Sequence, residues 1–257
     1  MRIKKVVRRL SYPLRLKPEA RWEEYTKSHL EKGSDYHDRF ESLPGRKYIW
    51  ELEKSLLLRI ANETGPIKRH LDFAGGTGRI AGVLEDIADQ QIVLDVSDKM
   101  LMVARDQLKK AEVICDDFNN RFHDEEMTNC DLITAFRFFP NAEPTLRDSA
   151  MKFIAKKLSN SGILICNNHR NFWSIPYFFR RVTFRGGTFG MTNKEIINLA
   201  AKYNLRLIKV YSMGILPQTE KYSILPWKVT NNIERNIFTN IGDKHRKGYN
   251  VIYIFSK

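Results

Sequence analysis

The residues with the clearest chemical potential lie around a glycine-rich turn, HLDFAGGTGRI at residues 70–80. An apolar run reaches Asp72 there and is followed by glycines and then by a helical pattern. Glycine lets the backbone turn sharply and lets a ligand approach closely, because no Cβ is in the way. A carboxylate just before such a turn attracts positive charge. The segment therefore predicts a binding loop whose ligand carries a cation near Asp72.

Further carboxylates end the next two apolar runs along the chain. Asp95 ends the run IVLD, and Asp116-Asp117 follows the run VIC. Because the carboxyl ends of parallel strands meet at one edge of a sheet, we expect these acids to face the glycine-rich turn together.

A nicotinamide-dependent dehydrogenase is the alternative reading of this loop. Residues 76–81 satisfy the dinucleotide pattern G-x-G-x-x-A, and Asp95 lies 19 residues after Gly76. Asp72, however, would repel a pyrophosphate at the start of the helix. A short-chain dehydrogenase would also need a Tyr-x-x-x-Lys pair on a helix, and only Tyr253 and Lys257 have that spacing. They end an expected strand, where four residues span about 13 Å.

Short apolar runs alternate with helical patterns from residue 67 onward, which is typical of a parallel sheet with crossover helices. We expect strands near 67–74, 91–96, 111–115, 131–136, 162–167, 205–212 and 249–256. We expect helices near 78–88, 98–109, 144–158 and 192–203. The predicted fold is α/β and Rossmann-like, a seven-stranded, mostly parallel sheet with helices on both faces and a helical N-terminal cap.

In these motifs the chain resembles the class I S-adenosylmethionine-dependent methyltransferases, over roughly residues 67–167. LDFAGGTGR is similar to the first motif of that family, with Ala74 in place of the usual first glycine. IVLDVSDKML resembles the second, which implies that Asp95 binds the ribose hydroxyls. VICDDF resembles the third, which implies that Asp116 binds the adenine amino group.

The resemblance also implies the surroundings of the cofactor, S-adenosyl-L-methionine. Val96 and Met100 would flank the adenine, and CDLITAFRFFPNAEP resembles the fourth motif, whose strand end would lie beside the methionine portion. SGILICNNH fits the strand that follows. The expected cofactor-binding residues are Asp72, Phe73, Ala74, Gly75, Gly76, Gly78, Asp95, Val96, Met100, Asp116, Asp117, Phe118, Phe136 and Arg137.

Groups that act on the methyl acceptor should follow strands four and five of the sheet, from Arg137 to the run Asn167–Arg170. His169 is the expected general base, because imidazole titrates near neutral pH; the alternative is a hydrogen bond that fixes the loop. Arg137 is expected to neutralise the cofactor carboxylate or an anionic acceptor, or to form a structural ion pair. No metal is expected, because Phe136-Arg137-Phe138 offers no carboxylate at the end of strand four.

Positive charge gathers at the two flanks of the chain. The formal net charge is +13, with +6 in residues 1–30, +11 in residues 170–257 and −4 in between. Basic flanks suit an anionic acceptor, RNA or an anionic lipid surface. The first ten residues have apolar and cationic sides at helical spacing, so they predict a short helix that lies on its own domain or on a membrane surface.

The expected organisation is a helical N-terminal extension and cap (1–62) followed by a methyltransferase domain (63–257). Two long connections lie in the latter, a lid-like insertion at 168–191 and an acceptor-side insertion at 214–248. No apolar run is long enough to cross a bilayer and no secretory signal is evident, so we expect a cytoplasmic protein, peripheral to the inner membrane face if residues 1–10 bind lipid. The three cysteines lack disulfide or zinc spacing.

Three functions remain open at this point, besides the dehydrogenase alternative. The first is methylation of a small or medium-sized acceptor at oxygen, with saccharides and anionic metabolites as fitting classes. The second is methylation of RNA, which the basic flanks interleaved with aromatic residues favour. The third is a cofactor-binding scaffold that does not catalyse transfer.

Overall fold

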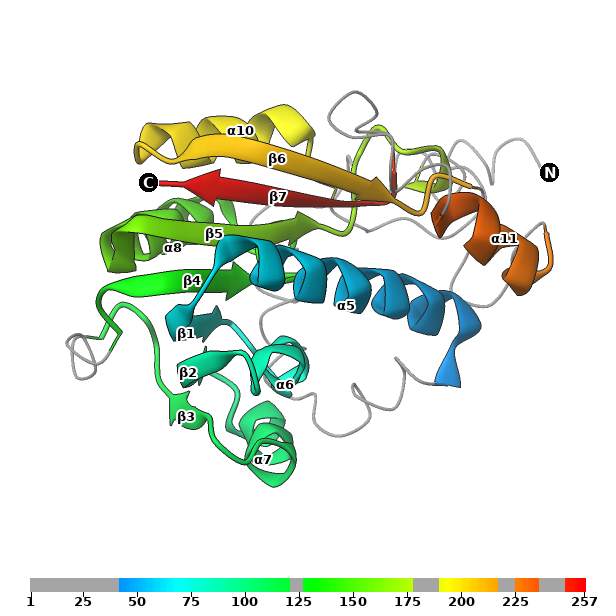
Figure 1. Cartoon of the computed structure of the whole chain (residues 1–257). Coiled ribbons are helices and arrows are strands. Elements are labelled where there is room, and N and C mark those ends of the chain that lie inside the picture. Colours follow the sequence, from blue (N-terminus) through cyan, green and yellow to red (C-terminus); the bar gives the residue numbers. More distant parts are fainter. Residues whose placement is uncertain (1–41, 121–126, 178–189, 217–224, 236–247) are drawn as a thin grey trace, which may run out of the picture.

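A computed structural model of the chain describes residues 42–120, 127–177, 190–216, 225–235 and 248–257. They form a seven-stranded sheet with helices packed on both faces (Figure 1). The Rossmann-like α/β fold predicted from the sequence is therefore confirmed. The expected helix of residues 1–10 and the cap before residue 42 lie outside the described residues, and the division of the chain at residue 62 remains a prediction.

The strands of the sheet follow the order β3-β2-β1-β4-β5-β7-β6. Strands β1 to β5 run parallel, and β7 runs antiparallel between β5 and β6. Each expected strand forms near its predicted range. Their bounds are Ile67–Phe73 for β1, Ala88–Asp95 for β2, Glu112–Cys115 for β3, Cys130–Ala135 for β4, Leu158–Asn168 for β5, Arg206–Met213 for β6 and Asn250–Ser256 for β7.

The helices connect the strands and cover the sheet (Figure 1). Within the part of the chain that the structure describes, none of them combines the length and apolar character needed to cross a membrane. Their bounds are Pro44–Thr64 for α5, Arg79–Leu84 for α6, Asp98–Gln107 for α7, Pro144–Lys157 for α8, Asn193–Lys202 for α10 and Trp227–Ile233 for α11.

Helix α5 packs along one face of the sheet together with α6. Pro44 occupies its first turn, where the missing N–H of proline costs no helical hydrogen bond. Apolar residues then recur at helical spacing, and Leu52, Leu56 and Leu57 lie buried against Leu132 and other residues of the sheet. This part of the predicted N-terminal unit therefore shares a hydrophobic core with the strands.

Helices α8 and α10 cover the other face of the sheet. Phe153 and Ile154 of α8 and Ile196 of α10 belong to the same core cluster as Leu71 and Phe73 of β1. Helix α10 begins with a capping box, in which Thr192 Oγ1 accepts a hydrogen bond from the Glu195 amide and the Glu195 carboxylate accepts one from the Thr192 amide. A layer of helices on each face keeps the parallel sheet dry.

The strand order reverses beside β1, where a ligand site is expected. β2 pairs with one side of β1, and β4, which follows β3 in the chain, pairs with the other side, so the strand order reverses between β1 and β4. A crevice opens outside the carboxyl ends of the strands at such a switch point. The glycine-rich turn after β1 lies at this crevice.

Leu57→Ala should lower the free energy of unfolding by about 2–5 kcal/mol, because it leaves a cavity between α5 and the sheet. Leu57 is fully buried. Lys54→Ala, on the exposed side of the same helix, should change it by less than about 0.5 kcal/mol. Urea unfolding of both variants measures the difference, and equal effects would contradict the packing of α5 on the sheet.

Candidate active site

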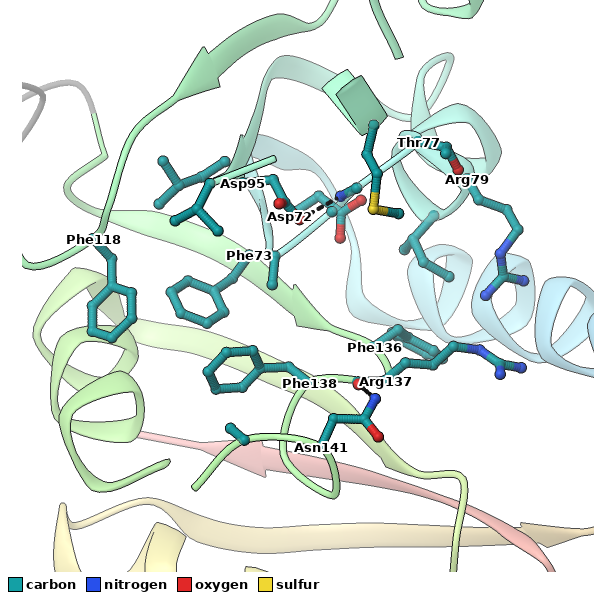
Figure 2. Close-up of a pocket in the computed structure, with 18 of the residues that line it drawn as sticks. Asp72, Phe73, Thr77, Arg79, Asp95, Phe118, Phe136, Arg137, Phe138 and Asn141 are labelled. Atoms are coloured by element: carbon teal, nitrogen blue, oxygen red, sulfur yellow. Dashed lines mark hydrogen bonds between the residues drawn. The ribbon is translucent and has the colours of Figure 1, made fainter. Parts of the chain in front are cut away.

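A cavity of about 250 Å³ opens at the carboxyl ends of β1 to β4 (Figure 2). It collects residues from the turns that follow these four strands. Its wall contains every residue predicted to bind the cofactor except Gly78. The lining residues are Asp72, Phe73, Ala74, Gly75, Gly76, Thr77, Arg79, Ile80, Leu94, Asp95, Val96, Met100, Asp116, Asp117, Phe118, Phe136, Arg137, Phe138, Asn141, Ala142 and Leu146.

The glycine-rich turn owes its shape to close approach and to left-handed backbone. Gly76 has φ 57°, and a Cβ there would lie 2.7 Å from Met100 Cε. Gly78 has φ 72°, and a Cβ there would lie 2.7 Å from Leu108 Cδ1, so this glycine serves helix packing. Ala74 also adopts the left-handed region, with φ 53°, which costs an alanine about 1 kcal/mol. The substitution noted in the first motif is therefore compatible with the turn.

Asp95 joins the turn after β1 to the turn after β2. Its Oδ2 accepts a hydrogen bond from the Gly76 amide at 2.9 Å, and its Oδ1 accepts one from the Ser97 amide at 2.9 Å. The carboxylate is 4% exposed and lines the cavity. Each carboxylate oxygen can accept further hydrogen bonds, so a diol in the cavity can donate to it.

Asp116 and Asp117 shape the turn after β3. The Asp116 amide donates to the Asp95 carbonyl at 3.1 Å, which brings the two turns together. Asp116 Oδ1 accepts hydrogen bonds from the Asp117 amide and from Asn120 Nδ2, and Asp117 Oδ1 accepts one from the Asn119 amide. Asp116 is half-buried and Asp117 is exposed, so Asp116 is the better placed of the two to meet a ligand.

Asp72 lies beneath the turn, 1% exposed. Its Oδ1 accepts a hydrogen bond from Thr134 Oγ1 at 2.8 Å, and its Oδ2 accepts one from the Ala81 amide at 3.2 Å. Burial raises the pKa of Asp72 to about 7, although both hydrogen bonds and the nearby Arg79 oppose the shift. Burial also lowers the pKa of His70, two residues earlier on the same side of β1, to about 3.

Phenylalanines form the apolar wall of the cavity. Phe73 contacts Phe118 and Phe138 edge to face, with ring centroids 5.2 and 5.1 Å apart. Phe118 is half-buried and lies in Figure 2 on the side of the cavity away from Arg137. This arrangement gives the cavity an aromatic end, which suits a nucleobase, and a cationic end.

Arg137 follows β4 in a left-handed conformation, with φ 63°. Its amide donates to Asn167 Oδ1 at 2.6 Å, and its carbonyl accepts from Asn141 Nδ2 at 2.5 Å. Asn167 Nδ2 donates in turn to Glu53 Oε1 of α5 and to Asn250 Oδ1 of β7. Asn167, Glu53 and Asn250 are fully buried. A buried polar cluster therefore fixes the backbone that carries the Arg137 side chain.

Arg79 adds a second guanidinium to the cationic end of the cavity. It pairs with Glu53 Oε2 at 3.3 Å and lies over the Trp50 ring, 3.9 Å from the ring centroid. Figure 2 shows the guanidinium groups of Arg79 and Arg137 on the same side of the cavity. Arg79 is not among the residues that the sequence predicts for the site, because a position in the first turn of a helix usually faces solvent.

His169, the predicted general base, does not line this cavity. It follows β5 and is 5% exposed. The neighbouring Asn168 is fully buried and donates to the Met191 carbonyl at 2.6 Å. The structure therefore brings Arg137 into the cavity wall and leaves Asn168 and His169 buried outside it.

The described part of the chain holds no group of three or more His, Cys, Asp and Glu side chains that could bind a metal ion. The absence of a resident metal thus stays a prediction from the sequence. The two long insertions are described only in part: Tyr177 is buried, Trp173 is 70% exposed, and the ring centroids of Trp227 of α11 and Tyr48 of α5 lie 6.1 Å apart.

The residues of the site fit S-adenosylmethionine. Asp95 offers carboxylate oxygens to a ribose diol, and Val96, 48% exposed at the rim, offers an apolar surface to a nucleobase. Asp72 provides negative charge and Arg137 positive charge, as the ammonium and carboxylate of a methionine moiety require. When bound, this cofactor supplies a methyl group that its sulfonium has already activated.

Two single substitutions should separate the contributions of His70 and Asp72 to the pH dependence of stability. Between about pH 4 and pH 6.5 the folded protein holds a proton on Asp72, whereas the unfolded chain holds one on His70. The contributions of the two groups to the slope of unfolding free energy against pH therefore cancel. In Asp72→Asn the unfolded state binds more protons, so stability should rise with pH from about 3 to 6.5, relative to wild type.

In His70→Leu the folded state binds more protons, so stability should fall as pH rises from about 4 to 7. Each slope should approach about 1.4 kcal/mol per pH unit. Urea unfolding at several pH values measures both. Slopes of the same sign in the two variants would contradict a protonated Asp72 and a neutral His70 in the folded protein.

Comparison with known proteins finds a methyltransferase domain within the chain. Residues 71–166 match the model of a family described as a methyltransferase domain. A search of curated proteins found no match.

Solved structures share the fold. Magnesium protoporphyrin IX methyltransferase from Synechocystis, solved with bound SAH, is 11% identical, with a TM-score of 0.60 over 90% of this chain and 98% of that one. A possible histamine N-methyltransferase from Thermotoga maritima is 17% identical, with a TM-score of 0.58 over 87% and 95%. A SAM-dependent methyltransferase from Archaeoglobus fulgidus is 14% identical, with a TM-score of 0.56 over 81% and 94%. Residues 71–166 therefore form a methyltransferase domain, and the chain shares the fold of these S-adenosylmethionine-dependent methyltransferases.

Proposed function

We propose that this methyltransferase acts on an oxygen atom of a small or medium-sized anionic acceptor, a metabolite or a saccharide that carries a carboxylate or phosphate. The supporting observation is the cationic end of the cavity, where Arg79 and Arg137 both line the wall on the same side. A guanidinium binds carboxylate and phosphate through paired hydrogen bonds.

The two arginines are held in the cavity wall by different contacts. Arg79 is paired with the buried Glu53 and lies on Trp50, so Glu53 offsets much of its charge. Arg137 lines the cavity after β4, and hydrogen bonds of its backbone with Asn167 and Asn141 hold it there. Arg137 can bind either the cofactor carboxylate or an anionic group of the acceptor. Either contact lies at the methionine end of the site.

Oxygen as the methylated atom follows from the predicted base. Transfer to a hydroxyl requires loss of a proton, and positioning supplies much of the remaining rate. His169 follows β5, the strand next to β4 and Arg137. His169 lies outside the cavity wall, so it can act as the base only on an acceptor that extends from the cavity toward the end of β5. His169 is therefore the proposed general base.

A fractionated cell extract incubated with methyl-labelled cofactor tests the acceptor class. The expected result is a small acidic product that gains one methyl ether, identified by mass spectrometry. Label that enters RNA instead would contradict the proposal and support RNA methylation. If the cofactor binds tightly but no fraction supports its turnover, the result would support a non-catalytic scaffold.

Asp95→Ala should weaken cofactor binding on the order of 100-fold, because two backbone amides lose a charged partner and the ribose loses its acceptor. Isothermal titration calorimetry with S-adenosylhomocysteine measures the affinity. Asp98→Ala is the matched control, since Asp98 is an exposed acid at the start of α7, outside the cavity wall. A similar loss in both variants would contradict the role of Asp95.

His169→Ala should lower kcat while the affinity for S-adenosylhomocysteine stays nearly unchanged. His169→Gln keeps a polar side chain and should lower kcat as well, because an amide takes no proton at neutral pH. Steady-state kinetics with the identified acceptor, together with calorimetry, separates the two quantities. Normal turnover in His169→Gln would show that His169 only fixes the loop.

A further inference from the structure

Five residues beneath the cofactor loop form a closed ring of hydrogen bonds. Asp72 and His70 come from β1, Gln91 from β2, Thr134 from β4 and Ala81 from α6. The strand register explains the meeting, since His70 pairs with Gln91 and Asp72 pairs with Thr134 in the sheet. The side chains of His70, Asp72, Gln91 and Thr134 are buried, and only Asp72 lines the cavity.

The direction of every hydrogen bond in the ring follows from one backbone carbonyl. Gln91 Nε2 lies 3.0 Å from the Ala81 carbonyl oxygen, and an amide oxygen at that position would face another acceptor. The amide nitrogen therefore occupies it and also donates to His70 Nδ1 at 2.9 Å. His70 must then carry its proton on Nε2.

The same direction continues to Asp72. His70 Nε2 donates to Thr134 Oγ1 at 2.8 Å, and the Thr134 hydroxyl proton is left to donate to Asp72 Oδ1 at 2.8 Å. The Ala81 amide donates to Asp72 Oδ2 at 3.2 Å. Both carboxylate oxygens thus receive a donor. A proton on Oδ1 would reverse the ring and bring two donors together between His70 and Gln91.

Burial acts against the ring, because it disfavours the ionised form of Asp72. The other charged groups near the carboxyl are Arg79 of α6, which favours ionisation, and Asp95 of β2, which opposes it. Glu53 of α5 is paired with Arg79 and so moderates its effect. His70 stays neutral, because its pKa is lowered to about 3.

We propose that Gln91, His70 and Thr134 are positioning residues that hold Asp72 as an acceptor for the cofactor's ammonium, and that binding of this ammonium expels one proton from the Asp72 carboxyl. Without ligand, a pKa of about 7 leaves the carboxyl partly protonated near neutral pH. A cation at the mouth of the turn then favours ionisation. Affinity for the cofactor therefore depends on pH through a group that lies mostly beneath the site.

Calorimetry of the full chain measures the released proton directly. S-adenosylhomocysteine is titrated near pH 7 in two buffers of different ionisation enthalpy, and about half a proton should be released per ligand, rising toward one at about pH 6. Methylthioadenosine, which has the nucleoside but no ammonium, should release none. Absence of proton release with S-adenosylhomocysteine at both pH values would overturn the proposal.

The pH profile of affinity tests the positioning residues. In the wild type, affinity should fall about tenfold for each pH unit below a midpoint near 7. Thr134→Val and Gln91→Leu should move the midpoint upward, and Thr134→Ser, which keeps the hydroxyl, should restore it. Asp72→Asn should abolish both the pH dependence and the proton release.

A purely structural role predicts a different result. Thr134→Val and Gln91→Leu would then weaken binding by the same factor at every pH, with an unchanged midpoint, and that outcome would overturn the role of the ring. If one variant fails to fold, the other and the wild-type calorimetry still decide. These measurements concern the cofactor alone, so their outcome is independent of the acceptor proposal.

Discussion

Hydrogen bonds from backbone amides to buried or half-buried carboxylates hold the strand ends of this protein together. Asp72 accepts from the amide of Ala81, Asp95 from those of Gly76 and Ser97, and Asp116 from that of Asp117. Three acids that face one cavity repel each other, and their amide partners offset that repulsion. The same contacts fix the turns after β1, β2 and β3, so the shape of the cofactor site and its negative charge have one physical origin. A cationic ligand completes the balance of charge.

The fold could be predicted well because its strands are short apolar runs separated by strong turn signals. The sequence pattern places the start of β2 too late, since Asp89 and Gln90 are exposed where the strand begins and resemble a loop. The helix after the glycine-rich turn is predicted to extend to residue 88 but ends at Leu84. Exposed polar residues at the ends of elements carry little periodic signal, so these boundaries depend on tertiary contacts.

The cofactor cavity could also be anticipated, because Asp72, Asp95 and Asp116 follow strands whose carboxyl ends must meet. The polar residues that support it could not. His70 and Thr134 lie within apolar strands, and nothing local in the sequence indicates that they contact each other across β1 and β4. Arg79 and Glu53 pair over 26 residues. A polar side chain in the middle of an apolar strand is the only local signal, and strand order is needed to find its partner.

The position of β7 has a consequence for how the molecule assembles. This strand follows β6 in the sequence yet lies between β5 and β6, so β6 has no sheet partner until β7 is in place. Asn250, at the start of β7, also completes the hydrogen bonds among Glu53 and Asn167, and it lies 197 residues from Glu53 along the chain. Contacts so distant in sequence form slowly, because loop-closure entropy must be overcome first. The half of the sheet that carries the glycine-rich turn can therefore take shape early, while the turn that carries Arg137 is fixed only when the closing strand is in place.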